Sequence, residues 1–352
     1  MTTTTQNISL PEILNAPRVM SSKPKHDHAY VWLFMKGDSY LPGVITSVHS
    51  VKRNNPAADL VVMVTDDISS KARQILLQIA THLCDIPYVT FESKQMKTKK
   101  QQDMYEKWVS SAYSKWNALL LPYKKVCLLD ADVIATTKID ELFDLSAPAA
   151  PIASPYTKPY GTIPVYYDRS ICDTDNYPRH GAKITPNVIS KTLNNNGLVI
   201  TATPVILEPN RKDFDGLINL ISNNLPFGFS QCHSAFDEQS LSFYYSSIGK
   251  DFGVIHQRYN YYPWHEKFIT KGDVPRVIHF FSTIKPWHMT FDRYSDVISW
   301  YKMAAECLDT YNILAEDVLL DPKNITSAKS AEDTYIKTHI QVNSILEVNK
   351  ML

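Results

Sequence analysis

The sequence lacks the segments that would carry the chain to or across a membrane. Its first residues, MTTTTQNISLPEILN, are polar and show neither the cationic start nor the apolar stretch of a secretory signal. No apolar run approaches the roughly 20 residues that a membrane-spanning helix needs. We therefore expect a cytoplasmic protein without a membrane span.

The chain also has few cysteines and no formal net charge. The five cysteines are scattered and form no CxxC pair, so neither a zinc site nor a disulfide framework is predicted. Lys plus Arg and Asp plus Glu number 36 each. This balance gives no basic surface for nucleic acid, so no nucleic-acid partner is expected and any phosphate site must be local. The 44% of apolar residues is enough for a large core.

Strand-like and helix-like segments alternate along the chain. After a predicted flexible leader, 1–28, apolar runs at 29–35, 61–65, 87–91 and 126–129 are typical of buried strands. Helical spacing follows at 39–53, 69–80 and 103–120, and again at 211–223, 236–247 and beyond 295. Residues 148–192 are predicted to form long loops around short strands, and 276–281 a further strand. This alternation predicts an α/β fold with a Rossmann-like, mainly parallel sheet and helices on both faces.

An acidic triplet, Asp130-Ala131-Asp132, follows the strand at 126–129. Two carboxylates at i and i+2, where a strand opens into a loop, can converge on one hard cation such as Mn²⁺ or Mg²⁺. A solvated surface turn is the plain alternative. The nucleophile motif of a haloacid-dehalogenase-type phosphatase is another, but it normally opens its domain, whereas a long α/β segment with Asp66-Asp67 precedes the triplet here.

A second polar group lies downstream, in the segment HFFSTIKPW from His279 to Trp287. A neutral imidazole at His279 would be a third metal ligand, and Lys285 would bring a positive charge to a diphosphate. Taken alone, His279 also fits a satisfied core histidine and KPW a plain turn. Occurring together after a strand-terminal acidic triplet, they predict a metal–diphosphate site.

The order of these segments resembles glycosyltransferase family 8, the glycogenin and galactosyltransferase group. The likeness rests on AYVWLFMKGDSYLPG, DAD with ELFDL, NNNGLVI, FDEQ and HFFSTIKPW, and it spans about 29–290. YSKWNALLLPYKKVCLLDAD is similar more narrowly to family-8-like proteins of large insect DNA viruses. The resemblance implies a single GT-A-type domain over 29–310 with a polar, helical extension at 311–352. It also implies a retaining transferase that uses Mn²⁺ or Mg²⁺ and moves a hexose from a UDP-sugar.

The resemblance also implies roles for individual residues. Asp130, Asp132 and His279 are implied metal ligands. Asp237, Glu238 and Gln239 are the implied catalytic group facing the anomeric carbon, although Asp237 also fits a helix N-cap. The residues implied to contact the nucleotide sugar are Phe34, Met35, Gly37, Tyr40, Lys115, Asp130, Ala131, Asp132, Asn195, Gly197, Ser282 and Lys285. Ser282 stands where the family usually has glycine, Lys115 also fits a solvated lysine, and Asn195–Gly197 also fits a simple turn.

Several features leave the acceptor and the assembly open. Tyr259, Tyr261, Tyr262 and Trp264 form a dense aromatic stretch that fits either an acceptor platform or core packing. The acceptor is a saccharide or a protein, and a homodimer stays an open expectation. A non-catalytic protein that binds a UDP-sugar is a third functional class. If the chain comes from a virus, the expected cytoplasmic location is the cytoplasm of the host cell.

Overall fold

The computed structural model describes residues 10–91, 99–153, 169–172, 177–194, 199–201, 203–223, 236–262, 275–281 and 284–333. Within these ranges, nine strands form one mixed sheet. Their spatial order is β1 (Val19–Met20), β4 (His82–Asp85), β3 (Asp59–Val64), β2 (His28–Phe34), β5 (Lys125–Leu129), β9 (Val205–Leu207), β7 (Ala149–Pro151), β10 (Phe252–Ile255) and β8 (Lys183–Ile184).

The order of the strands creates a switch point in the sheet. Strands β4, β3, β2 and β5 are parallel to one another, while β9 runs antiparallel to both of its neighbours, β5 and β7. The chain moves outward from β2 to β3 to β4 and then returns to β5 on the other side of β2. Ligands of such sheets bind where the strand order reverses, beyond the carboxyl ends of the strands. That place is the carboxyl end of β2 and β5.

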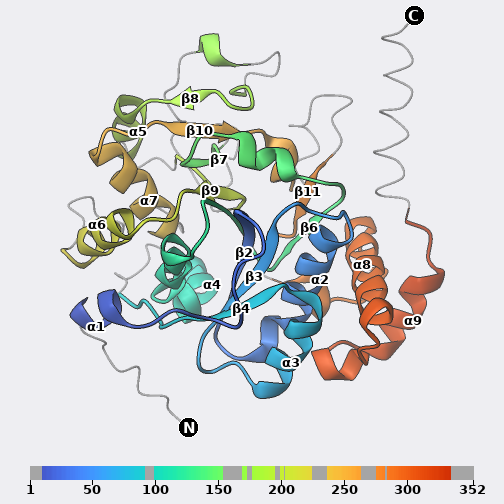
Figure 1. Ribbon diagram of the computed structural model, residues 1–352. Helices are drawn as coiled ribbons and strands as arrows, with labels where there is room; N and C mark the ends of the chain where they lie inside the picture. The colour runs from blue at the N-terminus through green and yellow to red at the C-terminus, as the bar shows by residue number, and fades with distance from the viewer. Residues whose placement is uncertain are drawn as a thin grey trace, which may run out of the picture.

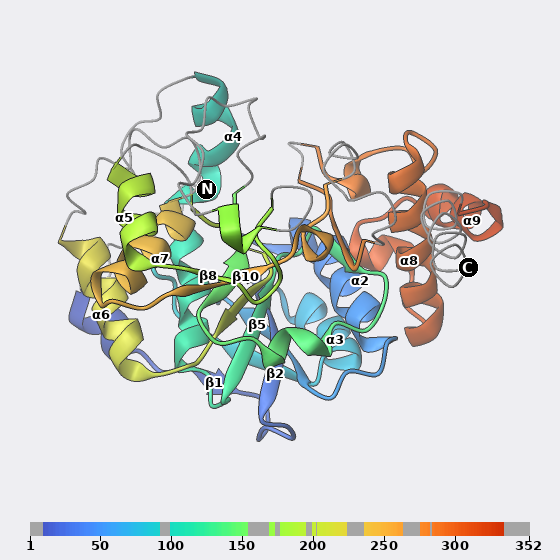
Figure 2. The ribbon, with the colours of Figure 1, turned by 90° about the horizontal axis from the view of Figure 1, so that it is seen from above.

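Helices cover both faces of the sheet (Figures 1 and 2). One layer contains α2 (Leu41–Lys52), α3 (Ser70–Ile79), α8 (Ser295–Tyr311) and α9 (Pro322–Ser330). The other contains α1 (Leu10–Asn15), α4 (Lys99–Val109), α5 (Pro186–Asn194), α6 (Arg211–Ser222) and α7 (Phe236–Ser247). Short 3-10 segments are η1 (Asp38–Tyr40), η2 (Ala112–Leu120), η3 (Asp140–Asp144), η5 (Arg169–Ile171), η7 (Gln257–Tyr259), η9 (Pro286–His288) and η10 (Ala315–Val318). The predicted layered α/β arrangement is confirmed.

Strand β2 shows why this sheet is buried on both sides. Successive side chains of a strand point to opposite faces. Tyr30, Trp32 and Phe34 pack into the core under α2, α3 and α8, whereas Ala29 and Val31 pack into the core under α6 and η2. A strand covered on both faces is apolar at nearly every position, which explains the uninterrupted run in the sequence.

Three predictions of local structure differ from the structure. The region 148–192, predicted as loops around short strands, also contains most of helix α5. The third strand is β4, at His82–Asp85, and not 87–91. Its polar first residue hid it from the apolar pattern, and Pro87 cannot continue the ladder because it has no N–H. The helix predicted at 103–120 is instead α4 followed by the 3-10 segment η2.

The structure bears on two further predictions, the flexible leader and the absence of a membrane span. Residues 10–15 form α1, and β1 pairs antiparallel with β4, so part of the segment 1–28 carries regular structure. Its flexibility stays a prediction. Among the described residues, no helix is both long enough and apolar enough to cross a bilayer.

Asp59, the first residue of β3, is a buried carboxylate that ties together the amino ends of several strands. It accepts hydrogen bonds from His26 Nδ1 at 2.8 Å, His82 Nε2 at 3.1 Å and the Tyr123 hydroxyl at 3.0 Å. The main-chain N–H of Lys25 donates a further bond, at 2.7 Å. Burial alone would raise the pKa of Asp59, but these hydrogen bonds, led by that of His26, hold it below its ordinary value.

We expect Asp59→Asn to lower the free energy of unfolding by about 2–4 kcal/mol, because an amide N–H would face hydrogen-bond donors. The carboxylate has a lowered pKa in the folded state, so its contribution is complete above the ordinary aspartate range and is lost as the pH falls through the folded-state pKa. Urea unfolding should therefore show a gap between variant and wild type that narrows in acid. Asp27→Asn, which breaks the exposed ion pair with Lys124, is the control and should leave stability nearly unchanged. Equal losses in the two variants at neutral pH would contradict the prediction.

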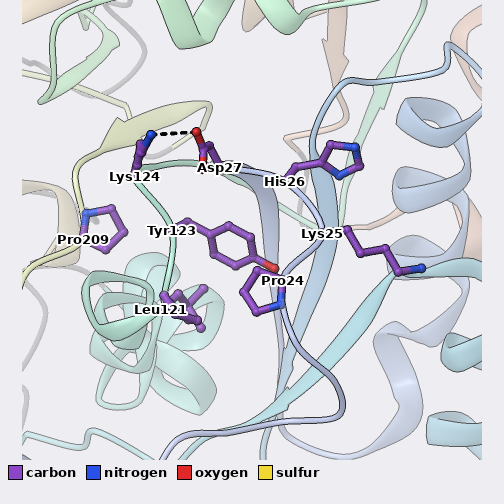
Figure 3. Close-up of a pocket in the computed structure, with 9 residues that line it drawn as sticks. Pro24, Lys25, His26, Asp27, Leu121, Tyr123, Lys124 and Pro209 are labelled. Atoms are coloured by element: carbon purple, nitrogen blue, oxygen red, sulfur yellow. Dashed lines mark hydrogen bonds and ion pairs between the residues drawn. The ribbon is translucent and has the colours of Figure 1, made fainter.

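A pocket of about 680 Å³ lies next to His26 and Tyr123, two of the residues that donate hydrogen bonds to Asp59 (Figure 3). His26 and Tyr123 line it, together with the Asp27–Lys124 ion pair, whose atoms are 2.7 Å apart. Its lining segments 24–27 and 121–124 precede β2 and β5. The pocket therefore lies at the opposite end of these strands from Asp130 and Asp132.

Candidate active site

The pairing of two short strands brings the acidic triplet and His279 together. β5 ends at Leu129, and the chain turns through Asp130–Asp132 into β6 (Val133–Ala135). β6 pairs antiparallel with β11 (Val277–His279), with His279 opposite Val133. The Phe280 N–H also donates to the Asp132 main-chain oxygen, at 2.8 Å. One ligand atom from each of Asp130, Asp132 and His279 lies within 4.8 Å of the others.

This group of three fits a divalent cation. Asp132 and His279 are buried, with 7% and 5% of their surfaces exposed, and His279 Nε2 lies 3.3 Å from Asp132 Oδ1. Mn²⁺ and Mg²⁺ bind a few protein groups and complete their octahedra with phosphate oxygens and water. Two carboxylates and one imidazole are such a partial set, so these residues could hold the ion while leaving positions for a ligand.

Two partly buried lysines face the aspartates. Lys285 Nζ lies 2.6 Å from Asp132 Oδ2. Lys115 Nζ lies 3.2 Å from Asp130 Oδ1 and 3.2 Å from Asp237 Oδ2. Burial by itself lowers the pKa of each lysine, but the neighbouring carboxylates outweigh it and raise both pKa values. Both lysines therefore stay charged, and Lys115 is not the solvated lysine of the alternative interpretation.

The two aspartates respond differently to their surroundings. Burial pushes the pKa of both upward. At Asp132, Lys285 and then His279 overcome burial, so its pKa falls well below the ordinary value. At Asp130, Lys115 opposes burial but the charge of Asp132 adds to it, and the pKa ends above the ordinary value. A cation held between the two carboxylates would stabilise the charge of Asp130 in particular.

Helix α2 approaches the acidic triplet through a glycine. A Cβ on Gly43 would lie 2.7 Å from the Ala131 main-chain oxygen and 2.5 Å from the Trp287 ring. Tyr40 packs edge-on against Trp287, with ring centres 5.2 Å apart. Burial raises the pKa of Tyr40, and the charges of Lys285 and Asp132 also act on it. The first loop, the triplet and the KPW segment therefore converge on one place. Sequence reasoning missed Gly43, although a glycine inside a helix costs about 1 kcal/mol and so signals close packing.

Of the predicted residues, Phe34 ends β2 with its side chain in the core, whereas Met35 and Gly37 lie in the loop that follows. Side chains from neighbouring segments hold this loop in place. Gly37 has a positive φ of 73°, which glycine adopts without strain, and its N–H donates to Asp67 Oδ2 at 3.1 Å. The Lys36 N–H donates to the Tyr88 hydroxyl at 2.9 Å. The roles of Asp67 and Tyr88 were not predicted from the sequence. Their contacts fix this loop at the switch point beside β5.

The predicted catalytic group lies at the start of α7. Asp237 is the second residue of that helix and pairs with Lys115, so it is not the residue before the helix that an N-cap requires. The charge of Glu238 also acts on Lys115, and Gln239 is buried. Lys115 thus brings the start of α7 next to Asp130.

Other predicted residues lie outside the described part of the chain or belong to the core. Asn195, Gly197, Ser282 and Trp264 are not among the described residues. Tyr259 and Tyr261 are 4% and 3% exposed and belong to the core, so packing, and not an acceptor platform, accounts for them. Tyr262 lies against the His279 ring, with centres 5.1 Å apart.

Comparison with known proteins defines the class. The profile of the family described as Glycosyl transferase family 8 matches residues 33–199. An uncharacterized protein of Acanthamoeba polyphaga mimivirus is 27% identical over 275 residues, which cover 74% of this chain and 83% of that protein. Glycogenin of Neurospora crassa is 22% identical over 273 residues, covering 75% of this chain and 32% of its own length. UDP-glucuronate:xylan alpha-glucuronosyltransferase 1 of Arabidopsis thaliana is 28% identical over 122 residues, 35% of this chain and 17% of that enzyme.

Solved structures agree on the fold. The galactosyltransferase LgtC, in complex with donor and acceptor sugar analogues, has a TM-score of 0.50 and 13% identity, covering 79% of this chain and 95% of that one. The fold is that of the GT-A glycosyltransferases. The match to the family 8 profile over residues 33–199 agrees with the resemblance seen in the sequence and favours a glycosyltransferase over the phosphatase alternative.

Proposed function

We propose that the chain is a metal-dependent, retaining glycosyltransferase that moves a hexose from a UDP-sugar to a saccharide or protein acceptor. The main support is the convergence of Asp130, Asp132 and His279, the last two buried, with Lys285 and Lys115 beside them, at the switch point of a GT-A sheet. The carboxylates at this edge suit a cation, and the lysines beside them suit a diphosphate.

The charged side chains have distinct tasks in this proposal. A divalent cation, when bound by Asp130, Asp132 and His279, would supply positive charge beside the diphosphate. Lys285 is partly buried and contacts Asp132. In the loaded site it would exchange this contact for a diphosphate oxygen, and its charge would offset the negative charge that grows on the leaving UDP.

The start of α7 would face the sugar. The anomeric carbon becomes oxocarbenium-like as the glycosidic bond breaks, and nearby carboxylate or amide oxygens stabilise it. Asp237, Glu238 and Gln239 offer such oxygens, and Lys115 holds Asp237 in place. This arrangement is compatible with a carboxylate nucleophile and with attack by the acceptor from the leaving-group face.

A screen of UDP-sugars for Mn²⁺-dependent hydrolysis tests the proposal. We expect UDP release from at least one UDP-hexose, its loss on adding a chelator, and its recovery when Mn²⁺ is restored. Binding of UDP without hydrolysis of any UDP-sugar would support the non-catalytic alternative. Release of phosphate from a simple phosphoester would contradict the transferase assignment.

We further propose a cytoplasmic location, a domain over 29–310 and an extension over 311–352. The nucleotide-sugar contacts at Asn195, Gly197 and Ser282 belong to the same proposal. Size-exclusion chromatography with light scattering would decide whether the chain forms a homodimer.

A further inference from the structure

His279 has a second buried polar neighbour, on the side of the ring away from Asp132. Its Nδ1 lies 2.8 Å from Asn260 Oδ1. Asn260 is 5% exposed, as is His279 itself. Asn260 falls in the aromatic stretch that the sequence singled out, yet its contact points to the metal-ligating histidine.

The orientation of the Asn260 amide is fixed by the partners of its nitrogen. Nδ2 donates to Thr201 Oγ1 at 2.7 Å and to the Tyr262 hydroxyl at 3.2 Å. The Thr201 hydroxyl in turn donates to the Pro151 main-chain oxygen at 3.4 Å, so a lone pair of Thr201 faces Asn260. A rotated amide would place its oxygen against that lone pair. The amide oxygen therefore faces His279.

The main chain holds the two residues side by side. The Tyr261 N–H donates to the Val277 oxygen at 3.0 Å, and the His279 N–H donates to the Tyr261 oxygen at 2.8 Å. Tyr261 also pairs in parallel with Ile278 of β11. Asn260 is thus part of a segment hydrogen-bonded directly to the strand that carries His279.

We propose that Asn260 is a positioning residue that fixes the tautomer of His279 for metal binding. An amide oxygen only accepts hydrogen bonds, so the proton of the neutral imidazole must lie on Nδ1. Nε2 then keeps its lone pair and faces Asp132 Oδ1 across 3.3 Å, on the side where a cation shared with Asp132 would lie. This inference rests on the proposed function, because it takes His279 to be a metal ligand.

Mn²⁺ binding, followed through the paramagnetic resonance of free Mn²⁺, tests the role without any turnover. Partners that orient a metal-binding histidine typically contribute about 10–100-fold in affinity, so Asn260→Ala should weaken Mn²⁺ binding by about that factor. Asn260→Asp should keep most of the affinity. Its carboxylate still accepts from Nδ1. The Tyr262 hydroxyl can turn to donate to it, and the Thr201 hydroxyl can do so only by giving up its bond to the Pro151 oxygen.

Asn117 supplies a matched control. It is fully buried, accepts from Arg18 Nε at 2.8 Å and donates to the Ser114 and Pro87 main-chain oxygens at 2.8 and 3.1 Å. Asn117→Ala removes a network of similar size that includes none of the proposed metal ligands. It should lower stability and leave the Mn²⁺ affinity unchanged.

Nitrogen NMR of the wild-type protein reports the tautomer directly. We expect a protonated Nδ1 and an unprotonated Nε2 on neutral His279. A proton on Nε2, wild-type Mn²⁺ affinity in a folded Asn260→Ala variant, or an equal loss in Asn117→Ala would overturn the inference. If Asn260→Ala does not fold, Asn260→Asp and the wild-type spectrum decide. If the wild type binds no Mn²⁺, the proposed metal dependence fails, while the spectrum still tests the tautomer.

Discussion

Asp132→Asn should abolish Mn²⁺-dependent transfer, lowering UDP-sugar turnover by about 10²–10³-fold or more. Asp132 is the carboxylate whose pKa is held low by Lys285 and His279, so it is ionised at any working pH. The asparagine side chain of the variant has no negative charge with which to bind a cation. It also leaves Lys285 without the partner 2.6 Å away, so some loss of stability is expected as well.

Two measurements separate the loss of the metal site from the loss of stability. Mn²⁺ binding should disappear in Asp132→Asn at temperatures where circular dichroism shows a folded protein. Asp59→Asn is a matched control, because it also removes a buried, hydrogen-bonded carboxylate, at the opposite end of the strands. While folded, it should keep both Mn²⁺ binding and turnover. Normal turnover in Asp132→Asn would refute the assignment of Asp132 as a metal ligand.

Lys285→Met should have two effects of opposite sign. UDP-sugar turnover should fall by about 10²–10³-fold, because a positive charge at the leaving diphosphate is lost. Mn²⁺ binding without nucleotide should tighten. Lys285 contacts Asp132 in the ligand-free site, and a cation at that carboxylate is repelled by the ammonium group.

Lys285→Arg is the control for this pair of effects, since it keeps the charge and the ability to pair with Asp132. It should retain the weaker Mn²⁺ binding of the wild type. Titrations of Mn²⁺ with and without UDP would measure both effects on one preparation. Unchanged Mn²⁺ affinity in Lys285→Met, together with unchanged turnover, would show that Lys285 serves neither the cation nor the diphosphate.

The sequence predicts the layered sheet and the acidic triplet because both depend on local patterns. The apolar runs of β2, β3 and β5 are buried on both faces, and Asp130 follows such a run directly. His279 is different. It reaches Asp132 only through the pairing of β6 with β11, and neither strand pattern specifies its partner, so family resemblance had to link the two segments.

The missed residues act through contacts that leave little trace in the sequence. Asn260 interacts with Thr201 and His279, both distant along the chain. Gly43 reads as an unfavourable residue inside a helix until the Ala131 oxygen and Trp287 are seen beside it. Asp59 is the polar first residue of an otherwise apolar strand, and only the fold brings two histidines and Tyr123 to it.

The pairing of β6 with β11 also determines when, during synthesis, the proposed ligand site can be completed. At usual rates of translation, a ribosome needs roughly 7–30 s to travel from Asp132 to His279. During that interval the nascent chain already contains Lys115 for Asp130, but neither His279 nor Lys285 for Asp132. A polypeptide released before β11 is made contains the residues of several parallel strands but lacks His279, a proposed metal ligand, and the positive charge of Lys285. Ligand-binding competence therefore comes late in biosynthesis, after most of the sheet has been made.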